Sequence, residues 1–115
     1  MQNRIEKIRS VLDNKKAENI DVINLDGQDY ITDVVVIATS LNEKHGHSLL
    51  NELKNELKPA GENFLGVDDN GEWVVADLGD IIIHIMTQAY REKYSLEVFL
   101  EELKSGVFDS RPDQV

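Results

Sequence analysis

The chain contains no cysteine. Disulfide bonds, thiolate metal sites and a cysteine nucleophile are therefore excluded. It also has no apolar run close to the roughly 20 residues that a helix needs to cross a bilayer. Its first residues, MQNRIEKIRSVLDNKK, form a charged amphipathic segment and not the apolar core of a signal peptide. These absences lead us to expect a soluble cytoplasmic protein.

Positive charge is scarce. The chain has 12 Lys and Arg against 22 Asp and Glu, and a formal net charge of −10. Because phosphate contacts need clustered Lys and Arg, we expect no direct nucleic-acid binding. The acidity suits a basic partner, since complementary fields speed encounter. Acidity that only confers solubility would explain the composition equally well.

The length of 115 residues suits one domain with one core. Apolar spacing predicts a helix over residues 3–17 and another from Asn42, its N-cap, to about Pro59. Strands are predicted over residues 20–24, 34–38, 64–67, 73–77 and 80–86, with a hairpin turn at Asp26-Gly27 and a closing helical region over 88–106. The order αββαβββα predicts an α/β (α+β) domain over residues 1–106, with a mixed sheet of about five strands and a flexible tail over 107–115.

The stretch WVVADLGDIIIHIM reads as a β-hairpin with a tight turn at Leu78-Gly79, because glycine can take a positive φ. A two-residue turn there would pair Asp77 with Asp80 and Trp73 with His84, all on one face. The other face would be wholly apolar and would look into the core; it holds Val74, Ala76, Leu78, Ile81, Ile83 and Ile85.

The mixed face predicts a recognition patch. Two opposed carboxylates cost stability unless they are solvated or hold a cation, and aromatic residues beside charges are typical of binding surfaces. Alternatively, Trp73 lies under a helix and the aspartates only decorate a turn. A metal site is disfavoured because His84 would lie roughly 13 Å from Asp80 along the strand. Acid–base catalysis by Asp77 and Asp80 is conceivable, but no nucleophile–base pair, phosphate-binding loop or metal motif accompanies them.

Four further residues have two interpretations each. His45 and His47, near the start of the second helix, could contact a partner or be solvated. Arg91 and Tyr94 are spaced i and i+3 and would share a helix face. They could border the patch or tie the last helix down.

The sequence resembles the ribosomal silencing factor family, also called RsfS or Iojap. The resemblance is carried by GEWVVADLGDIIIHIM and the following REKYSLEVF, with ITDVVVIATS and PAGENFLGV upstream. Its most specific part is the pattern W-x-x-x-D-x-G-D-x-x-x-H, and the similarity extends from about Ile5 to Leu100.

Membership would imply a translational repressor. Such proteins bind the large ribosomal subunit through its protein number fourteen, block joining of the small subunit, and are often homodimers when free. The resemblance implies no catalysis and no cofactor, although the fold is similar to nucleotidyltransferases without their catalytic motif. It implies a partner-binding surface that comprises Trp73, Asp77, Asp80, His84, Arg91 and Tyr94. Contact with ribosomal RNA would be incidental to this protein interface.

The chain departs from the family pattern at several positions. Ser40 and Leu41 stand in a turn where the family has glycine, Lys44 replaces an arginine, and Leu100 stands where the family often has tryptophan. Two other functions remain open on the residues alone. One is a nucleotidyltransferase-like metal-dependent enzyme, and the other is an acidic interaction module with a different basic partner, such as an antitoxin.

Overall fold

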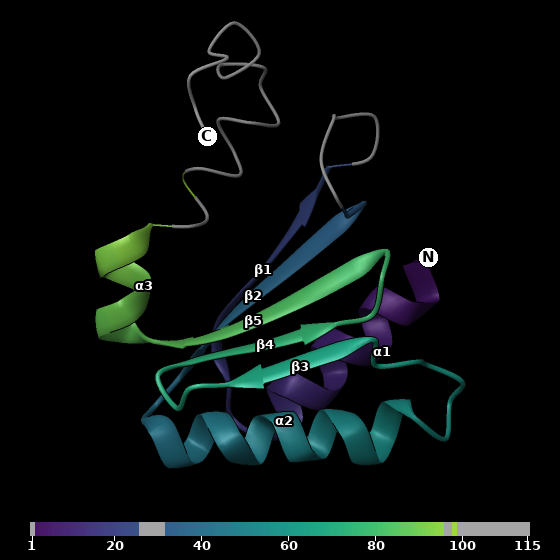
Figure 1. Cartoon of the computed structure of the whole chain (residues 1–115), viewed down its shortest axis with the longest axis horizontal. Coiled ribbons are helices and arrows are strands. Elements are labelled where there is room, and N and C mark those ends of the chain that lie inside the picture. The colour runs from purple at the N-terminus through teal and green to yellow at the C-terminus, as the bar shows by residue number, and fades with distance from the viewer. Residues whose placement is uncertain (1, 26–31, 96–97, 99–115) are drawn as a thin grey trace, which may run out of the picture.

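The computed structural model describes residues 2–25, 32–95 and 98. Its elements are α1 (Gln2–Asn14), β1 (Glu18–Asn24), β2 (Val34–Ser40), α2 (Glu43–Leu57), β3 (Gly66–Asp69), β4 (Trp73–Asp77), β5 (Ile81–Thr87) and α3 (Gln88–Tyr94). The five strands form one sheet in the order β1-β2-β5-β4-β3 (Figure 1). Only β2 and β5 run parallel, so the predicted mixed sheet and the predicted element order are confirmed.

The centre of the sheet is the parallel pair of β2 and β5. All seven residues of β2 are buried, which confirms the prediction of a strand covered on both faces. Buried parallel strands read as continuous apolar runs because neither face is left to solvent. Six of the seven β5 residues are also buried, and His84 is the exception.

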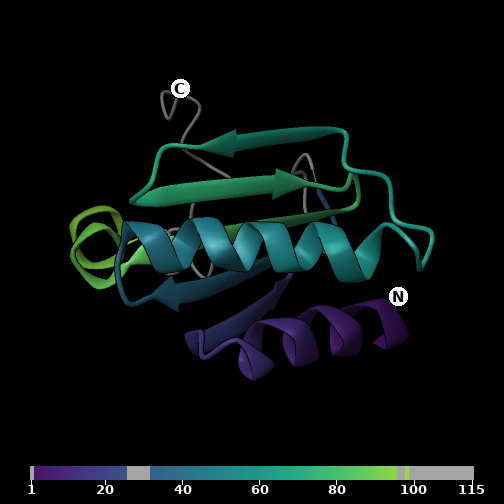
Figure 2. The ribbon, with the colours of Figure 1, turned by 90° about the horizontal axis from the view of Figure 1, so that it is seen from below.

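Helices α1 and α2 lie side by side over one face of the sheet (Figure 2). Each helix buries one apolar stripe, with Asn42 capping α2 by accepting a hydrogen bond from the His45 backbone N–H at 2.8 Å. The predicted apolar face of the hairpin meets these stripes, so that prediction is confirmed. The joined core includes Ile5, Ile8, Val11, Leu12, Leu49, Leu50, Leu53, Leu57, Val74, Ala76, Leu78, Ile81, Ile83 and Ile85.

The predicted register of the hairpin is wrong by two residues. Trp73 pairs with Met86 and Val75 with His84, while the Leu78 N–H donates to the Ile81 carbonyl at 2.8 Å. The turn residues are therefore Gly79-Asp80, with Gly79 at φ +95°. Glycine is favoured at this first central position because a type II′ turn needs a positive φ there. A shift by an even number of residues keeps the side chains of both strands on their predicted faces, whereas Asp80 now lies in the turn.

Several predicted segments lie wholly or mostly outside the described residues. These are the turn at Asp26-Gly27, most of the closing helical region beyond Tyr94, and the tail over 107–115. The third predicted strand, at residues 64–67, is observed two residues later as the edge strand β3. No helix in the described part of the chain has the length and apolar character of a membrane span.

We expect Gly79→Ala to destabilise the domain by about 1–2 kcal/mol, because alanine is strained at this φ and its Cβ would lie 3.1 Å from Leu65 Cδ1. Gly66→Ala is the matched control, since its Cβ would meet no atom closer than 4.0 Å. Urea unfolding measures both variants. Equal stability of the two would contradict the assigned turn.

Candidate partner-binding face

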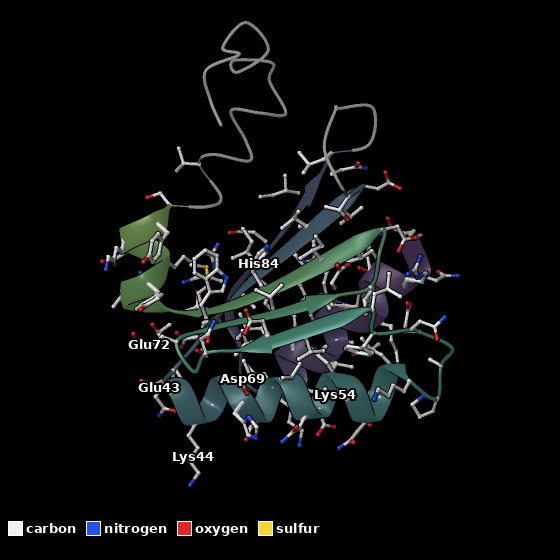
Figure 3. All side chains as sticks on the ribbon, in the orientation of Figure 1. Glu43, Lys44, Lys54, Asp69, Glu72 and His84 are labelled. Carbon is white, nitrogen blue, oxygen red and sulfur yellow. The ribbon has the colours of Figure 1, made fainter. Side chains whose placement is uncertain are left out.

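The face of the sheet away from α1 and α2 carries the mixed polar and aromatic side chains of the β4–β5 hairpin. We call it the distal face, and in Figure 3 His84 lies on this side of the sheet. It is continuous with a second apolar cluster that contains Ile23, Leu25, Val35, Ile37 and Met86, against which Trp73 and Tyr90 pack. From β4 and β5, the distal face comprises Trp73, Val75, Asp77, Ile82, His84 and Met86.

Trp73 and His84 form the centre of this face. The Trp73 Nε1–H donates to His84 Nδ1 at 3.0 Å, and the two ring centroids are 5.9 Å apart. The residues are diagonal neighbours in the observed register, a separation that aromatic side chains can bridge. The sequence prediction that they share a face is confirmed, although they are not direct partners.

The indole fixes the chemistry of the imidazole. An indole N–H can only donate, so His84 Nδ1 must be unprotonated and the neutral ring carries its proton on Nε2. Burial lowers the pKa of His84 from 6.5 to about 4, because charging a desolvated ring is unfavourable. At neutral pH, the distal face therefore presents an uncharged donor here.

Helix α3 extends the aromatic surface. It begins directly after β5, where Thr87 Oγ1 accepts from the Tyr90 N–H. Its Tyr94 ring lies 5.2 Å from that of Trp73 and 5.4 Å from that of Tyr90, and Tyr94 is 46% exposed. The Lys93 Nζ lies 5.4 Å from the Tyr94 ring centroid, so the exposed ring already attracts a cation.

Asp77 lies at the turn end of the distal face and is partly buried. Its Oδ1 accepts from the Gly79 N–H at 2.7 Å. Within the part of the chain that the structure describes, its Oδ2 has no hydrogen-bond partner. One oxygen therefore stabilises the turn, while the other is available to a donor from outside.

The predicted placement of Asp80 is wrong. Its carboxylate accepts from Arg4 Nη1 at 2.7 Å and Nη2 at 2.9 Å, and the same guanidinium also holds Glu62. These hydrogen bonds lower the pKa of Asp80. The physical reason is the register: Asp80 sits inside the turn and points toward α1, so it does not face Asp77. The carboxylate pair that acid–base catalysis would require is not formed.

Arg91 is buried, being 6% exposed. Its Nη1 donates to the Asn19 carbonyl and to Thr39 Oγ1, and its Nη2 donates to Asp21. It thereby fastens α3 to β1 and β2, which is the second of the two predicted interpretations. Tyr94 contacts the Trp73 ring instead, so the two residues predicted to share a surface have different surroundings.

The two histidines of α2 also have defined contacts. His45 Nδ1 accepts from the Leu41 N–H at 2.9 Å, and its Nε2 lies 2.7 Å from the Lys15 carbonyl. It joins the end of α1 to the start of α2, a role that neither predicted interpretation contained. His47 lies 2.5 Å from Asp69 of β3. Sequence reasoning also missed Arg4, whose partners lie 58 and 76 residues away, and Tyr90, for which the i, i+4 spacing to Tyr94 was an available signal.

A metal site finds no support at these residues. Among residues 2–25, 32–95 and 98, no three histidines or carboxylates gather in a way that could hold an ion. The arrangement is that of a small mixed α/β domain with an aromatic cluster on the distal face, beside which Asp77 Oδ2 has no hydrogen-bond partner among the described residues.

Comparison with known proteins assigns the chain to a family. The family model described as "Ribosomal silencing factor during starvation" matches residues 1–114. The chain is 33% identical over 95 residues to ribosomal silencing factor RsfS of Haemophilus influenzae, covering 81% of this chain and 93% of that protein. It is 30% identical over 102 residues to RsfS of Bacillus subtilis, covering 84% of each. The chain belongs to the ribosomal silencing factor family.

The fold agrees with this assignment. A crystal structure of a protein from Chromobacterium violaceum superposes with a TM-score of 0.82 at 25% identity, covering 87% of this chain and 85% of that one. The predicted resemblance is therefore confirmed. Since the family is named for a regulatory activity on ribosomes, the chain is a ribosome-associated regulatory protein by membership.

We expect stability to fall as pH decreases from 6.5 to about 4, because the unfolded chain then binds a proton that buried His84 does not. The His84 contribution is fully present above pH 6.5 and amounts to at most about 3 kcal/mol. His84→Asn is the control, because its Oδ1 can accept from Trp73 but cannot titrate. Urea unfolding between pH 4 and 7.5 should give a flatter profile for His84→Asn, and parallel profiles would refute this linkage.

We expect Arg91→Lys to cost about 2 kcal/mol, because lysine cannot make the same forked hydrogen bonds. The Asp21 pair contributes little to this cost, since the Asp21 side chain is 55% exposed. Tyr94→Ala should cost less, about 0.5–1 kcal/mol for the lost ring contact. Urea unfolding measures the free energy of unfolding of both variants. A greater loss of stability in Tyr94→Ala than in Arg91→Lys would contradict the assignment of Arg91 as the structural residue.

Proposed function

We propose that this protein is a non-catalytic translational repressor. It binds the large ribosomal subunit through ribosomal protein number fourteen and prevents the small subunit from joining. Family membership supports the ribosomal role. The observation that carries the binding proposal is the Trp73–His84–Tyr94 cluster on the distal face, with the Asp77 carboxylate beside it.

The chemistry of the distal face fits a basic protein. The rings of Trp73 and Tyr94 offer flat, partly exposed area that loses little side-chain entropy on binding, and such residues dominate protein interfaces. Asp77 Oδ2 can accept from a lysine or an arginine. The neutral His84 Nε2–H can donate to a carbonyl without adding a positive charge that would repel the partner.

The six residues of the predicted surface then divide into two groups. Trp73, Asp77, His84 and Tyr94 are the contact residues of our proposal. Asp80 and Arg91 are positioning residues, since one fixes the hairpin turn to α1 and the other fixes α3 to the sheet. Removing either should weaken binding only as far as it disturbs the fold.

Repression needs no chemical step. A domain bound on the surface that receives the small subunit excludes it by volume alone. The requirement is kinetic, because the factor must dissociate slowly compared with attempts at subunit joining. The resemblance further implies a homodimer in the free state, which light scattering of the purified protein would detect.

A subunit-joining assay tests the function. We expect the wild-type protein to reduce formation of complete ribosomes and to sediment with the large subunit and not with the small one. Trp73→Ala should weaken binding at least tenfold, about 1.4 kcal/mol or more, as expected for a central aromatic contact. Asp77→Asn should also weaken binding, while its Oδ1 still accepts from the Gly79 N–H and keeps the turn.

Asp80→Asn is the matched control for Asp77→Asn. It also removes one negative charge at this turn, but from a side chain that points toward α1. It should bind as wild type does, within about twofold. If both substitutions weaken binding equally, net charge and not the distal face decides affinity. If the wild-type protein sediments with neither subunit, the proposed function is wrong.

Two alternatives are separated by the same preparations. A metal-dependent nucleotidyltransferase should gain thermal stability from magnesium or manganese with nucleoside triphosphates, because ligands that bind only the folded state stabilise it. An acidic module for another partner should leave subunit joining unchanged. The formation of the Asp80–Arg4 pair in place of an Asp77–Asp80 pair argues against the first alternative.

A further inference from the structure

The outer side of α2 carries a basic stripe. We define it as Lys44, His47, Asn51, Lys54 and Lys58, of which the last follows the helix as its C-cap. The intervals of three, four, three and four residues place all five on one side of the helix. Four of them are exposed and Lys54 is half-buried. Figure 3 shows Lys44 pointing away from the sheet.

Two of the three glutamates of α2 lie on its other flank, and the third, Glu43, lies in the first turn directly before Lys44. Glu52 and Glu56 face α1, where they pair with Lys15 at 3.8 Å and Lys7 at 3.9 Å. Within the described ranges, the three lysines of the basic stripe make no such ion pair. At the boundary lies Asp69 of β3. Its pKa is lowered mainly by its hydrogen bond to His47 and also by the charge of Lys54. The basic stripe is therefore a cationic surface on a chain with a net charge of −10.

We infer that the basic stripe binds the phosphate backbone of ribosomal RNA. Lysine ammonium groups and the amide of Asn51 are typical donors to phosphate oxygens. Lys44 to Lys58 spans about 21 Å along the helix axis, which matches several successive phosphates of one strand. The exposed side chains of Ser48 and Asn55 continue the donor surface toward solvent. No carboxylate of α2 interrupts the stripe between its ends.

The inference rests on the proposed function, because the stripe acts only after docking. The overall negative charge opposes encounter of the free protein with RNA. Once the distal face is bound, a neighbouring RNA strand is present at a high effective concentration, and a weak contact then adds affinity. The stripe lies on the flank of α2 next to β3, as the His47–Asp69 contact shows. The domain thus offers two differently directed surfaces to one particle.

The test compares two triple variants of equal net charge. The first carries Lys44→Gln, Lys54→Gln and Lys58→Gln, and the second carries Lys7→Gln, Lys15→Gln and Lys16→Gln on α1 and the residues after it. Binding to purified large subunits is measured between 50 and 300 mM KCl, with thermal unfolding as the check on folding. We expect the stripe variant to bind about tenfold more weakly at 100 mM and to show a shallower salt dependence. The α1 variant should stay within about twofold of wild type.

A photoreactive diazirine amino acid in place of Asn51 identifies what the stripe touches. Crosslinks to ribosomal RNA support the inference. Crosslinks only to ribosomal proteins overturn it, as does equal weakening by the two triple variants. Both of those outcomes leave the proposed function intact, provided that Trp73→Ala still weakens binding at least tenfold. Wild-type protein that binds no subunit at all would overturn the inference together with the proposed function.

Discussion

The pairing of β4 with β5 depends on one two-residue turn. Which side chains lie on each face of the sheet depends on that pairing. Gly79 supplies the positive φ, and the Asp80 carbonyl accepts from the backbone N–H groups of Asp33 and Val34 at 3.2 and 3.1 Å. The turn is therefore attached to the start of β2, which sets Val34 beside Ile81 in the parallel pair. Because side chains alternate along a strand, this register sends Ile81, Ile83 and Ile85 toward α1 and α2. It sends Trp73 and His84 to the distal face.

A neutral imidazole is the consequence of where the register puts His84. The ring lies between buried apolar strands and accepts from an indole, so a proton on Nδ1 would lose a hydrogen bond and leave a poorly solvated charge. The neutral His84 ring can therefore act toward a partner as a hydrogen-bond donor, through its Nε2–H. The cations near the distal face lie instead at its margin, where Lys93 packs over the rings of Tyr90 and Tyr94. A partner's lysine or arginine would compete for the Tyr94 ring.

Local patterns in the sequence were sufficient for the elements and for the faces, but not for the long-range polar contacts. The 3.6-residue spacing of Ile5, Ile8 and Val11 and the unbroken apolar run of β2 are properties of single segments, so periodicity finds them. The hairpin was misplaced by two residues because Asp-Leu-Gly-Asp permits a turn on either side of Gly79. Arg4, Arg91 and His45 hold residues at least 30 positions distant. No local signal marks such partners, because a side chain's neighbours follow from the finished fold.

Helical periodicity also explains how an acidic chain can contain a basic surface. On α2, Glu52 and Glu56 each lie about 160° around the axis from Lys54, so these charges occupy different flanks. The acidic flank meets the lysines of α1 and is largely compensated there. The basic flank is compensated only in part, by Glu43 in the first turn of α2 and by Asp69 of β3, which binds His47. Since exposed charges are screened over roughly 8–10 Å at physiological salt, local charge and not net charge governs contact with a nearby surface. The distal face can therefore favour a basic protein while the basic stripe favours the negatively charged RNA backbone, both on the same ribosomal particle.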